Sequence, residues 1–378
     1  MTEKATLVIV ELLWNAENQP KPGTPITFSV TVKSEETCKK QTSVTVFVDR
    51  TALPVMVYDG VLEAGETHVF ESTVWEATKG NHVITAVVDG VMPSPDNFGT
   101  GVIVTKNMRV AEKALPIPAP AAAAGMNTLT FSDDFTDANT IDWDATGDIG
   151  YKWYLTLPFG APDTTPEDME LTQDGILLKK RNIVFNYGLG MMDIKTGAGW
   201  GYTHGYLETR FRVPKESKKK GQHPAIWSLS PQTMWRKQPE YVELDFMEYW
   251  GTNFGPEYLY TVSMHQIKLK TQPDQPQRIL FHANNFPASH HNGMGDEEWH
   301  TMGWLWEEGL LTTYLDGEEV FTQRWSKEGY PEPSFTMKVG EQKSGIFSIL
   351  DEQLLPLIIC GGEACPTEVD YLNIWQAK

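Results

Sequence analysis

The sequence has little cysteine and no long hydrophobic run. Its three cysteines, Cys38, Cys360 and Cys365, do not form a C-x-x-C motif or another zinc or redox spacing. We predict buried thiols, with a local Cys360–Cys365 disulfide as the alternative. The first apolar run, residues 6–14, is interrupted by Glu11 and is too short for a signal peptide or a membrane helix. We therefore expect a soluble chain.

Basic residues are also scarce. The chain has 31 Lys and Arg against 50 Asp and Glu, which gives a formal net charge of -19. This charge repels the phosphates of nucleic acids and of anionic membranes, so neither is an expected partner. It also disfavours a heavily sulfated polysaccharide and favours a neutral polymer.

Helical periodicity and three common catalytic motifs are absent as well. The chain has no G-x-S-x-G elbow, no P-loop and no H-E-x-x-H, which leaves serine hydrolases, nucleotide enzymes and zinc proteases without support. Apolar and polar residues instead alternate, as in residues 206–213, 310–315 and 368–375. This period is typical of β-strands and predicts an all-β chain with antiparallel sheets.

The composition divides the chain into two predicted domains. In residues 1–114, short alternating runs recur at spacings near ten residues and predict a small β-sandwich. These runs are residues 6–14, 26–33, 42–48, 66–76, 82–89 and 101–110. Residues 115–125, LPIPAPAAAAG, combine proline and alanine without charge and predict a semi-extended linker. Residues 126–378 are long enough for one large antiparallel sandwich.

The hexapeptide ELDFME at residues 243–248 places three carboxylates in an otherwise apolar run. In a β-strand alternate side chains share a face, so Glu243 and Asp245 would point the same way. Glu248 is five residues from Glu243 and would lie on the other face of a regular strand. One extra residue, a β-bulge near Met247, would return it to the face of the other acids.

Three clustered acids repel one another, and the repulsion raises at least one pKa and separates an acid from a base. Cleavage of a glycosidic bond requires this pair of roles. With the bulge, the two glutamates would approach the separation of roughly 5–5.5 Å at which one carboxylate attacks the sugar and the other donates a proton. The alternative is a solvated strand face that is simply acidic.

The hexapeptide resembles the E-[IL]-D-[IVF]-[MV]-E signature of glycoside hydrolase family sixteen, in its bulged, laminarinase-like form. Other segments resemble motifs of this family in the same order along the chain. They are GYLETRF at 205–211, PAIW at 224–227, WHTMGWLW at 299–306, YLDG at 314–317 and EVDYLNIW at 368–375. The resemblance spans nearly all of the second domain.

This resemblance implies a concanavalin-like β-jelly-roll whose concave face forms a sugar cleft. It implies Glu243 as the nucleophile, Glu248 as the general acid/base and Asp245 between them. The expected activity is that of an endo-acting retaining β-glycanase on β-1,3- or mixed β-1,3/1,4-glucan. Two alternatives stay open: a galactan hydrolase of the agarase or carrageenase type, and a non-catalytic lectin.

Aromatic and histidine side chains near the hexapeptide are candidates for binding sugar, because indole and phenol rings stack on sugar faces. The candidates are Trp200, His223, Trp227, Tyr249, Trp250 and His265. Trp227 is the first choice, since the resemblance covers it. His223 stands where laminarinase-like members usually carry a tryptophan. Trp304 and Trp306 alternate on one strand face and are assigned to the core.

The resemblance also bears on cofactors and on the first domain. Asp370 matches a position that often ligates calcium in the family, so a structural calcium ion is possible, and no cofactor is required for catalysis. Residues 22–32, 60–67 and 87–97 look like the bacterial cell-adhesion-related immunoglobulin-like domain, which implies a spacer or a glycan-binding module; we favour the spacer. We expect a monomer, secreted or held at the cell surface, whose export signal is absent from this sequence.

Overall fold

The computed structural model describes most of the chain. The described residues are 7–38, 41–157, 164–179, 188–213, 224–231, 235, 240–249, 260–268, 278–285, 297–324, 336–338, 351–361 and 366–378. Strands dominate throughout, with one short α-helix and two 3-10 turns among these residues, η1 (Ala138–Thr140) and η2 (Pro166–Asp168). The all-β fold class, a small sandwich followed by a larger jelly-roll type sandwich, is confirmed.

The N-terminal part forms two packed antiparallel sheets and a short ribbon. One sheet has the order β1-β3-β7, the other has the order β10-β9-β4-β5 with β6 also on β4, and β2 pairs with β8. The bounds are β1 Leu7–Trp14, β2 Pro25–Ile26, β3 Phe28–Ser34, β4 Thr42–Val48, β5 Thr51–Ala52, β6 Met56–Tyr58, β7 Thr67–Glu71, β8 Trp75–Glu76, β9 Gly80–Val88 and β10 Ile103–Val110. All six predicted runs contain strand, whereas β5 and β6 are too short for alternation to reveal them.

The predicted linker is not semi-extended throughout. Residues Ala119–Ala123 form α1, for which the alanine content is favourable. Ala121 is fully buried against Tyr206 and Trp375 of the second part. Packing of this small side chain holds the segment against the sandwich, and the predicted semi-extended conformation is wrong for residues 119–123.

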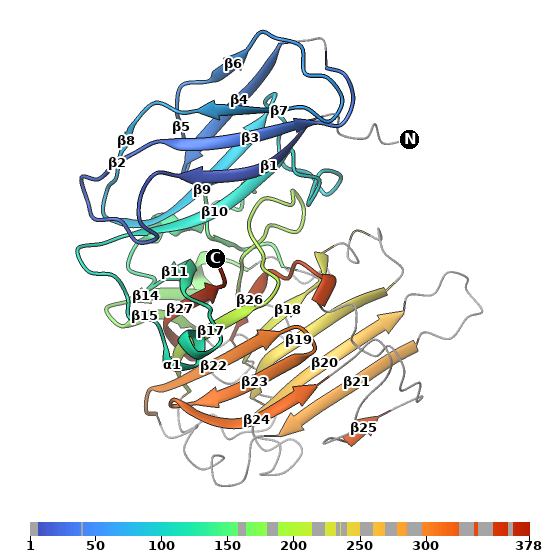
Figure 1. Cartoon of the computed structure of the whole chain (residues 1–378). Helices are drawn as coiled ribbons and strands as arrows, with labels where there is room; N and C mark the ends of the chain where they lie inside the picture. Colours follow the sequence, from blue (N-terminus) through green and yellow to red (C-terminus); the bar gives the residue numbers. More distant parts are fainter. Residues whose placement is uncertain are drawn as a thin grey trace.

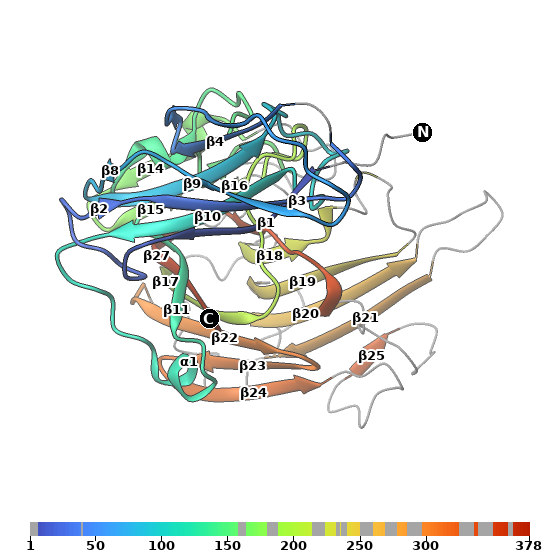
Figure 2. The same ribbon diagram turned by 45° about the horizontal axis from the view of Figure 1, so that its top comes forward.

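The second part is built from two large sheets, shown in Figures 1 and 2. One has the order β14-β15-β27-β17-β22-β23-β24, with β11 on β27. Its bounds are β11 Thr128–Asp133, β14 Met169–Thr172, β15 Gly175–Leu178, β17 Gly205–Arg212, β22 His300–Glu307, β23 Leu310–Leu315, β24 Glu318–Arg324 and β27 Thr367–Gln376. All of its pairings are antiparallel, as predicted.

The other sheet carries the acidic hexapeptide near its middle. Its order is β12-β13-β16-β26-β18-β19-β20-β21-β25. The bounds are β12 Ile141–Asp142, β13 Trp153–Tyr154, β16 Gly188–Gly190, β18 Ala225–Leu229, β19 Glu240–Tyr249, β20 Tyr260–Lys268, β21 Arg278–Asn285, β25 Thr336–Lys338 and β26 Leu357–Cys360. One pair, β12 with β13, is parallel; β19 is flanked by β18 and β20 and is therefore a central strand.

The main hydrophobic core lies between these two sheets. Alternate side chains of both sheets enter it, among them Leu207 and Ile374 from one and Leu244 and Ile359 from the other. Trp304 and Trp306 are fully buried here, which confirms their assignment to the core. Burial of side chains of this size is worth about 1.5–3 kcal/mol each and holds the two sheets face to face.

The N-terminal sandwich is packed directly against the second part, as Figure 1 shows for β10 and β11. Val87 of β9 shares a buried cluster with Ile149, Tyr151 and Tyr154. The guanidinium of Arg50 donates to the hydroxyl of Tyr151 at 2.7 Å. These contacts hold the two parts together in addition to the covalent connection.

Two further contacts tie the parts together through the backbone. The side chain of Asn18 both accepts from the amide and donates to the carbonyl of Leu129, at 2.8 and 2.9 Å. A Cβ atom placed on Gly150 would lie 2.2 Å from the carbonyl oxygen of Asp49, so only glycine permits this approach.

Among the helices in the part of the chain described, none is long and apolar enough to cross a membrane.

Candidate active site

Strand β19 contains one extra residue relative to both of its neighbours. Against β20, Asp245 pairs with Ser263 and Glu248 pairs with Thr261, so three residue steps on β19 correspond to two on β20. The register between β18 and β19 shifts at the same place. This two-against-one pairing defines a β-bulge, as the spacing of the acids predicts.

The bulge places two consecutive side chains on one face. Phe246 and Met247 both point into the main core and are at most 1% exposed. Because the alternation restarts after this pair, the three acids fall on the opposite face. Glu243, Asp245 and Glu248 therefore share the face that points away from the main core.

The three carboxylates form a row along β19, with Asp245 in the middle. Their partners on β18 form a second row beside them, Leu229 with Glu243, Trp227 with Asp245, and Ala225 with Glu248. On the other side, the backbone position of His265 on β20 is directly opposite Glu243. The sheet thus fixes the order of the acids without any contribution from loops.

Burial differs along the row. Asp245 is 4% exposed and Glu248 is 7% exposed, while Glu243 is partly exposed. Burying a carboxylate is costly, because the charge loses its hydration. A structure that keeps two of them in a central strand provides the conditions under which one carboxyl group is held protonated and another ionised.

Beside the acids lies a small apolar cluster that is separate from the main core. It is formed by alternate residues of β18 and β26, together with one residue that follows β13. The members are Leu157, Ala225, Trp227, Leu229, Ile358 and Cys360. An apolar surface next to carboxylates excludes water and strengthens their electrostatic interactions.

Trp227 and Cys360 are joined within this cluster. The indole Nε1 of Trp227 donates a hydrogen bond to Sγ of Cys360 at 3.2 Å. Burial raises the pKa of the Cys360 thiol to about 12; the negative charge of Asp245 contributes to this rise, and the hydrogen bond from Trp227 opposes it. The thiol is therefore neutral at physiological pH and fixes the orientation of the indole ring.

The predicted sugar-binding residues do not all lie near the acids. Trp227 is in the row beside them, although its ring is only 6% exposed. Trp200 stacks on Phe131 at a centroid distance of 5.6 Å and packs against the main core. Tyr249 is fully buried in that core. Tyr249 is thus placed on the core side of the sheet, away from the carboxylates, because the bulge and the strand alternation direct it there.

The structure gives less for the other three candidates, Trp250, His223 and His265. Trp250 and His223 lie outside the described residues. For His265 the structure describes the backbone in β20, which lies opposite Glu243 in the register; its role in binding sugar stays a prediction.

Asp370 lies on β27 in the other large sheet. Its carboxylate accepts a hydrogen bond from the guanidinium of Arg210 at 2.6 Å. No group of three or more His, Cys, Asp or Glu side chains suited to a metal occurs among the residues described. A carboxylate already neutralised by arginine is a poor cation ligand, so this donor set does not fit a calcium ion at Asp370.

The predicted buried thiols are found for two of the cysteines. Cys38 is buried beside the hydroxyl of Thr42, and Cys360 is buried in the apolar cluster. Cys365 lies outside the described residues. The alternative of a disulfide through Cys360 is wrong, because its sulfur is a free thiol that accepts from Trp227.

Sequence reasoning missed Cys360 and Ile358 as neighbours of the acids. These residues are more than 100 positions from the hexapeptide and reach it through the pairing of β26 with β18. Their alternation with Leu357 and Ile359 indicates a strand that is buried on both faces. It does not indicate which strand lies beside it.

Comparison with known proteins gives remote structural similarity only. No family model matches the chain, and no curated protein matches it. The laminarinase from Flavobacterium sp. UMI-01 is similar in structure at 15% identity, covering 66% of this chain and 100% of that chain with a TM-score of 0.42. The laminarinase catalytic domain from Thermotoga maritima is similar at 16% identity, covering 66% and 98% with a TM-score of 0.39.

An endo-β-1,3-glucanase from Pyrococcus furiosus is similar at 15% identity, covering 66% of this chain and 94% of that chain with a TM-score of 0.40. With TM-scores below 0.5, these similarities do not decide the activity. The functional conclusion rests on the geometry of β19 and its neighbours.

Proposed function

We propose that this protein is an endo-acting retaining β-glycanase that hydrolyses β-1,3- or mixed β-1,3/1,4-glucan. The observation that carries the proposal is the β-bulge at Phe246 and Met247. It brings Glu243, Asp245 and Glu248 onto one face of a central strand. A regular strand without the bulge would place Glu248 on the face opposite Glu243 and Asp245. An acidic strand with only a structural role does not require all three acids on one face.

The proposed reaction proceeds by double displacement. Glu243, the more exposed acid of the row, attacks the anomeric carbon while Glu248 protonates the departing glycosidic oxygen. The bond from the sugar to that oxygen breaks as the ester with Glu243 forms. Glu248 then removes a proton from water, which attacks the anomeric carbon and releases Glu243 as a carboxylate.

Burial supports the division of roles between the two glutamates. Glu248 is 7% exposed, and a carboxyl group shielded from water favours its neutral, proton-donating form. Asp245 occupies the middle of the row, where its charge also disfavours ionisation of a neighbour. An apolar floor of Trp227 and Ile358 limits access of water to the row.

The substrate class rests on charge and on the sequence resemblance. A net charge of -19 is easier to reconcile with a neutral glucan than with a sulfated galactan. Since a polysaccharide does not enter a cell intact, we place the enzyme outside the cell, acting as a monomer. The preference for β-1,3 or mixed β-1,3/1,4 linkages depends on the shape of the loops that border the cleft.

The test is substitution of the nucleophile. Glu243→Ala should reduce turnover of laminarin or lichenan by at least about 10⁴-fold, because no covalent intermediate can form. Binding of the same glucan should change little. The matched control is Glu318→Ala, which removes an exposed carboxylate from β24 and should leave turnover unchanged. Full activity of Glu243→Ala would contradict the assignment.

A further inference from the structure

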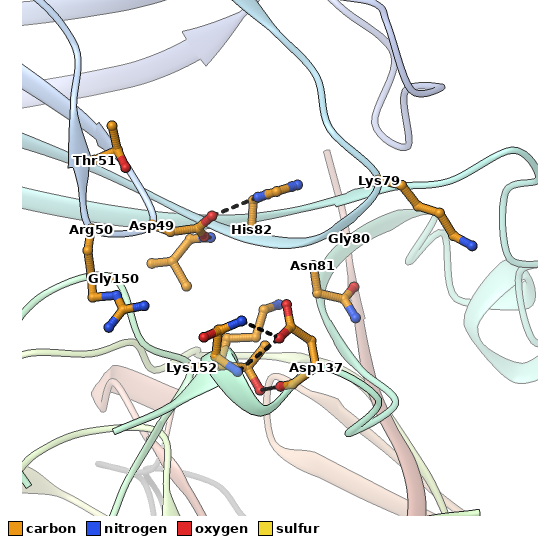
Figure 3. Close-up of a pocket in the computed structure, with 13 residues that line it drawn as sticks. Asp49, Arg50, Thr51, Lys79, Gly80, Asn81, His82, Asp137, Gly150 and Lys152 are labelled. Carbon is orange, nitrogen blue, oxygen red and sulfur yellow. Dashed lines mark hydrogen bonds and ion pairs between the residues drawn. The ribbon is translucent and has the colours of Figure 1, made fainter. Parts of the chain in front are cut away.

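A cavity lies where the N-terminal sandwich meets the second part. It has a volume of about 540 Å³ and is shown in Figure 3. Its upper wall comes from residues 49–51 and 79–83, and its lower wall from Asp137, Asn139, Thr140, Gly150 and Lys152. Sites for small ligands commonly occur between domains and in this range of volume.

Three cationic side chains line this cavity, and none makes an ion pair with a carboxylate in the part of the chain that the structure describes. The ammonium of Lys152 is 2% exposed and donates to the carbonyl oxygen of Ser132 at 2.7 Å. Arg50 donates to the hydroxyl of Tyr151. Lys79 lies at the rim of the cavity, and its side chain extends away from the centre of the cavity. An ammonium has three N–H groups and a guanidinium has five, so both retain unused donors.

The two acidic residues of the lining are already engaged. Asp49 accepts from the amide of Val83 at 2.9 Å and pairs with Nδ1 of His82 at 2.8 Å. Asp137 accepts from the backbone and the side-chain amide of Asn139, both at 2.9 Å. Neither carboxylate makes an ion pair with Lys152 among the described residues, although the charges of Asp49 and of the neighbouring Asp133 and Asp134 raise the pKa of this ammonium. The lining thus has three cationic side chains against two carboxylates, in a chain with a net charge of -19.

The cavity also contains an unused acceptor. Oδ1 of Asn81 is buried and has no hydrogen-bond donor among the described residues. Figure 3 shows this side chain projecting from the N-terminal part toward Asp137. A buried polar atom without a partner destabilises the fold, and a ligand hydroxyl group would supply the missing hydrogen bond.

We propose that this cavity binds a carboxylate-bearing sugar of the hexuronate type. The carboxylate lies against Arg50 and Lys152, and a sugar hydroxyl group donates to Oδ1 of Asn81. A volume of about 540 Å³ exceeds the needs of an inorganic anion and accommodates a monosaccharide or disaccharide. The site is remote in sequence from Glu243 and does not depend on the proposed reaction.

Binding to a site built from both parts has a predictable effect on stability. Because the ligand contacts residues of the two sandwiches at once, it stabilises the docked arrangement and raises the melting temperature. Catalytic activity at the row of acids should be unaffected by the ligand. The two proposals can therefore fail separately. The rise in melting temperature tests the cavity, and catalytic activity tests the row of acids.

The experiment is calorimetric titration of the full chain with glucuronate, glucose and acetate. Glucuronate should bind at least about tenfold more tightly than either of the others, because charge-assisted hydrogen bonds are stronger than neutral ones. Equal binding of glucose would show that the cations are not used. Equal binding of acetate would show an anion site without sugar recognition. Either result, or no binding of glucuronate at millimolar concentration, overturns the proposal.

Variants locate the binding. Arg50→Gln should weaken glucuronate binding by about tenfold or more and should reduce the accompanying rise in melting temperature. Lys33→Gln, on an exposed position of β3, is the matched control and should bind as the wild type does. Asn81→Ala should weaken the binding of glucuronate but not that of acetate. Unchanged affinity in Arg50→Gln would place the ligand elsewhere and overturn the assignment.

Discussion

At the scale of single residues, Cys360 connects the apolar floor to the row of acids. Its thiol accepts from the indole of Trp227, and burial raises its pKa to about 12. The thiolate is the reactive form of cysteine, so a group with this pKa is inert at moderate pH. This residue orients an aromatic ring and is not itself a nucleophile.

We predict that Cys360 resists alkylation in the folded protein. With a pKa of about 12, less than roughly one thiol in a thousand is ionised at pH 8.5. Iodoacetamide at this pH should leave the peptide that contains Cys360 unmodified in the native state and should label it fully after denaturation in urea. Peptide mapping by mass spectrometry measures this. Rapid labelling of the native protein would contradict the buried position.

The buried ammonium of Lys152 should make the free energy of unfolding depend on pH. Burial lowers its pKa from 10.5 to about 8, because the ammonium loses hydration. Between these two values the unfolded chain binds more protons, so stability increases as pH rises. The destabilisation is fully present below pH 8 and is relieved as pH rises toward 10.5.

The matching measurement compares the wild type with Lys152→Met. Between pH 8 and pH 9.5 the free energy of unfolding of the wild type should rise by about 1.5 kcal/mol relative to the variant. Urea denaturation at several pH values provides these differences, and titrations shared by both proteins cancel. A constant difference over this range would mean that the ammonium is not desolvated.

At the scale of elements, the bulge in β19 was predictable because acids and apolar residues have opposite preferences for burial. Glu243, Asp245 and Glu248 cannot share a face with an apolar core, and their spacing requires an extra residue between Asp245 and Glu248. The pairing with both neighbouring strands confirms it. The residues of β26 that lie beside the acids were not predictable. Alternation along a sequence indicates which face of a strand a side chain is on, but not which strand pairs with it.

The contact between Gly150 and Asp49 leads to an element-scale prediction. Gly150 has φ of +96°, and a Cβ there would lie 2.2 Å from the carbonyl oxygen of Asp49. Gly150→Ala should lower the free energy of unfolding by more than the roughly 1–2 kcal/mol that the backbone conformation alone costs. Chemical denaturation measures the effect.

The control for this variant is Gly90→Ala. Gly90 has φ of +68°, but a Cβ there meets nothing within 4 Å. The control therefore includes the conformational cost without the steric clash, and the difference between the variants reports the contact between the two parts. Equal destabilisation of both variants would show that this contact can relax freely.

At the scale of the whole molecule, the N-terminal sandwich is a docked part of the protein. The sequence predicted its strands and the position of the Pro/Ala segment, because both depend on local pattern. It did not predict the cluster of Val87 with Ile149 and Tyr154, or the cavity beside it. Such contacts join segments far apart in the chain, where periodicity carries no information.

The central claim is that the row of acids cleaves a β-glycosidic bond with retention of configuration. The two-sheet scaffold places Glu243 and Glu248 on one face of β19, and the bulge is the element that makes this possible. A nucleophile on the enzyme gives two inversions at the anomeric carbon and so returns the β configuration. An inverting enzyme would give the α configuration in a single step.

Proton NMR of the products formed in the first minutes of glucan hydrolysis tests this most directly. We expect the new reducing end to appear first as the β anomer and only later to equilibrate with the α anomer. An initial α anomer from a β-linked glucan would contradict Glu243 as the nucleophile, and with it the function proposed for the bulged strand.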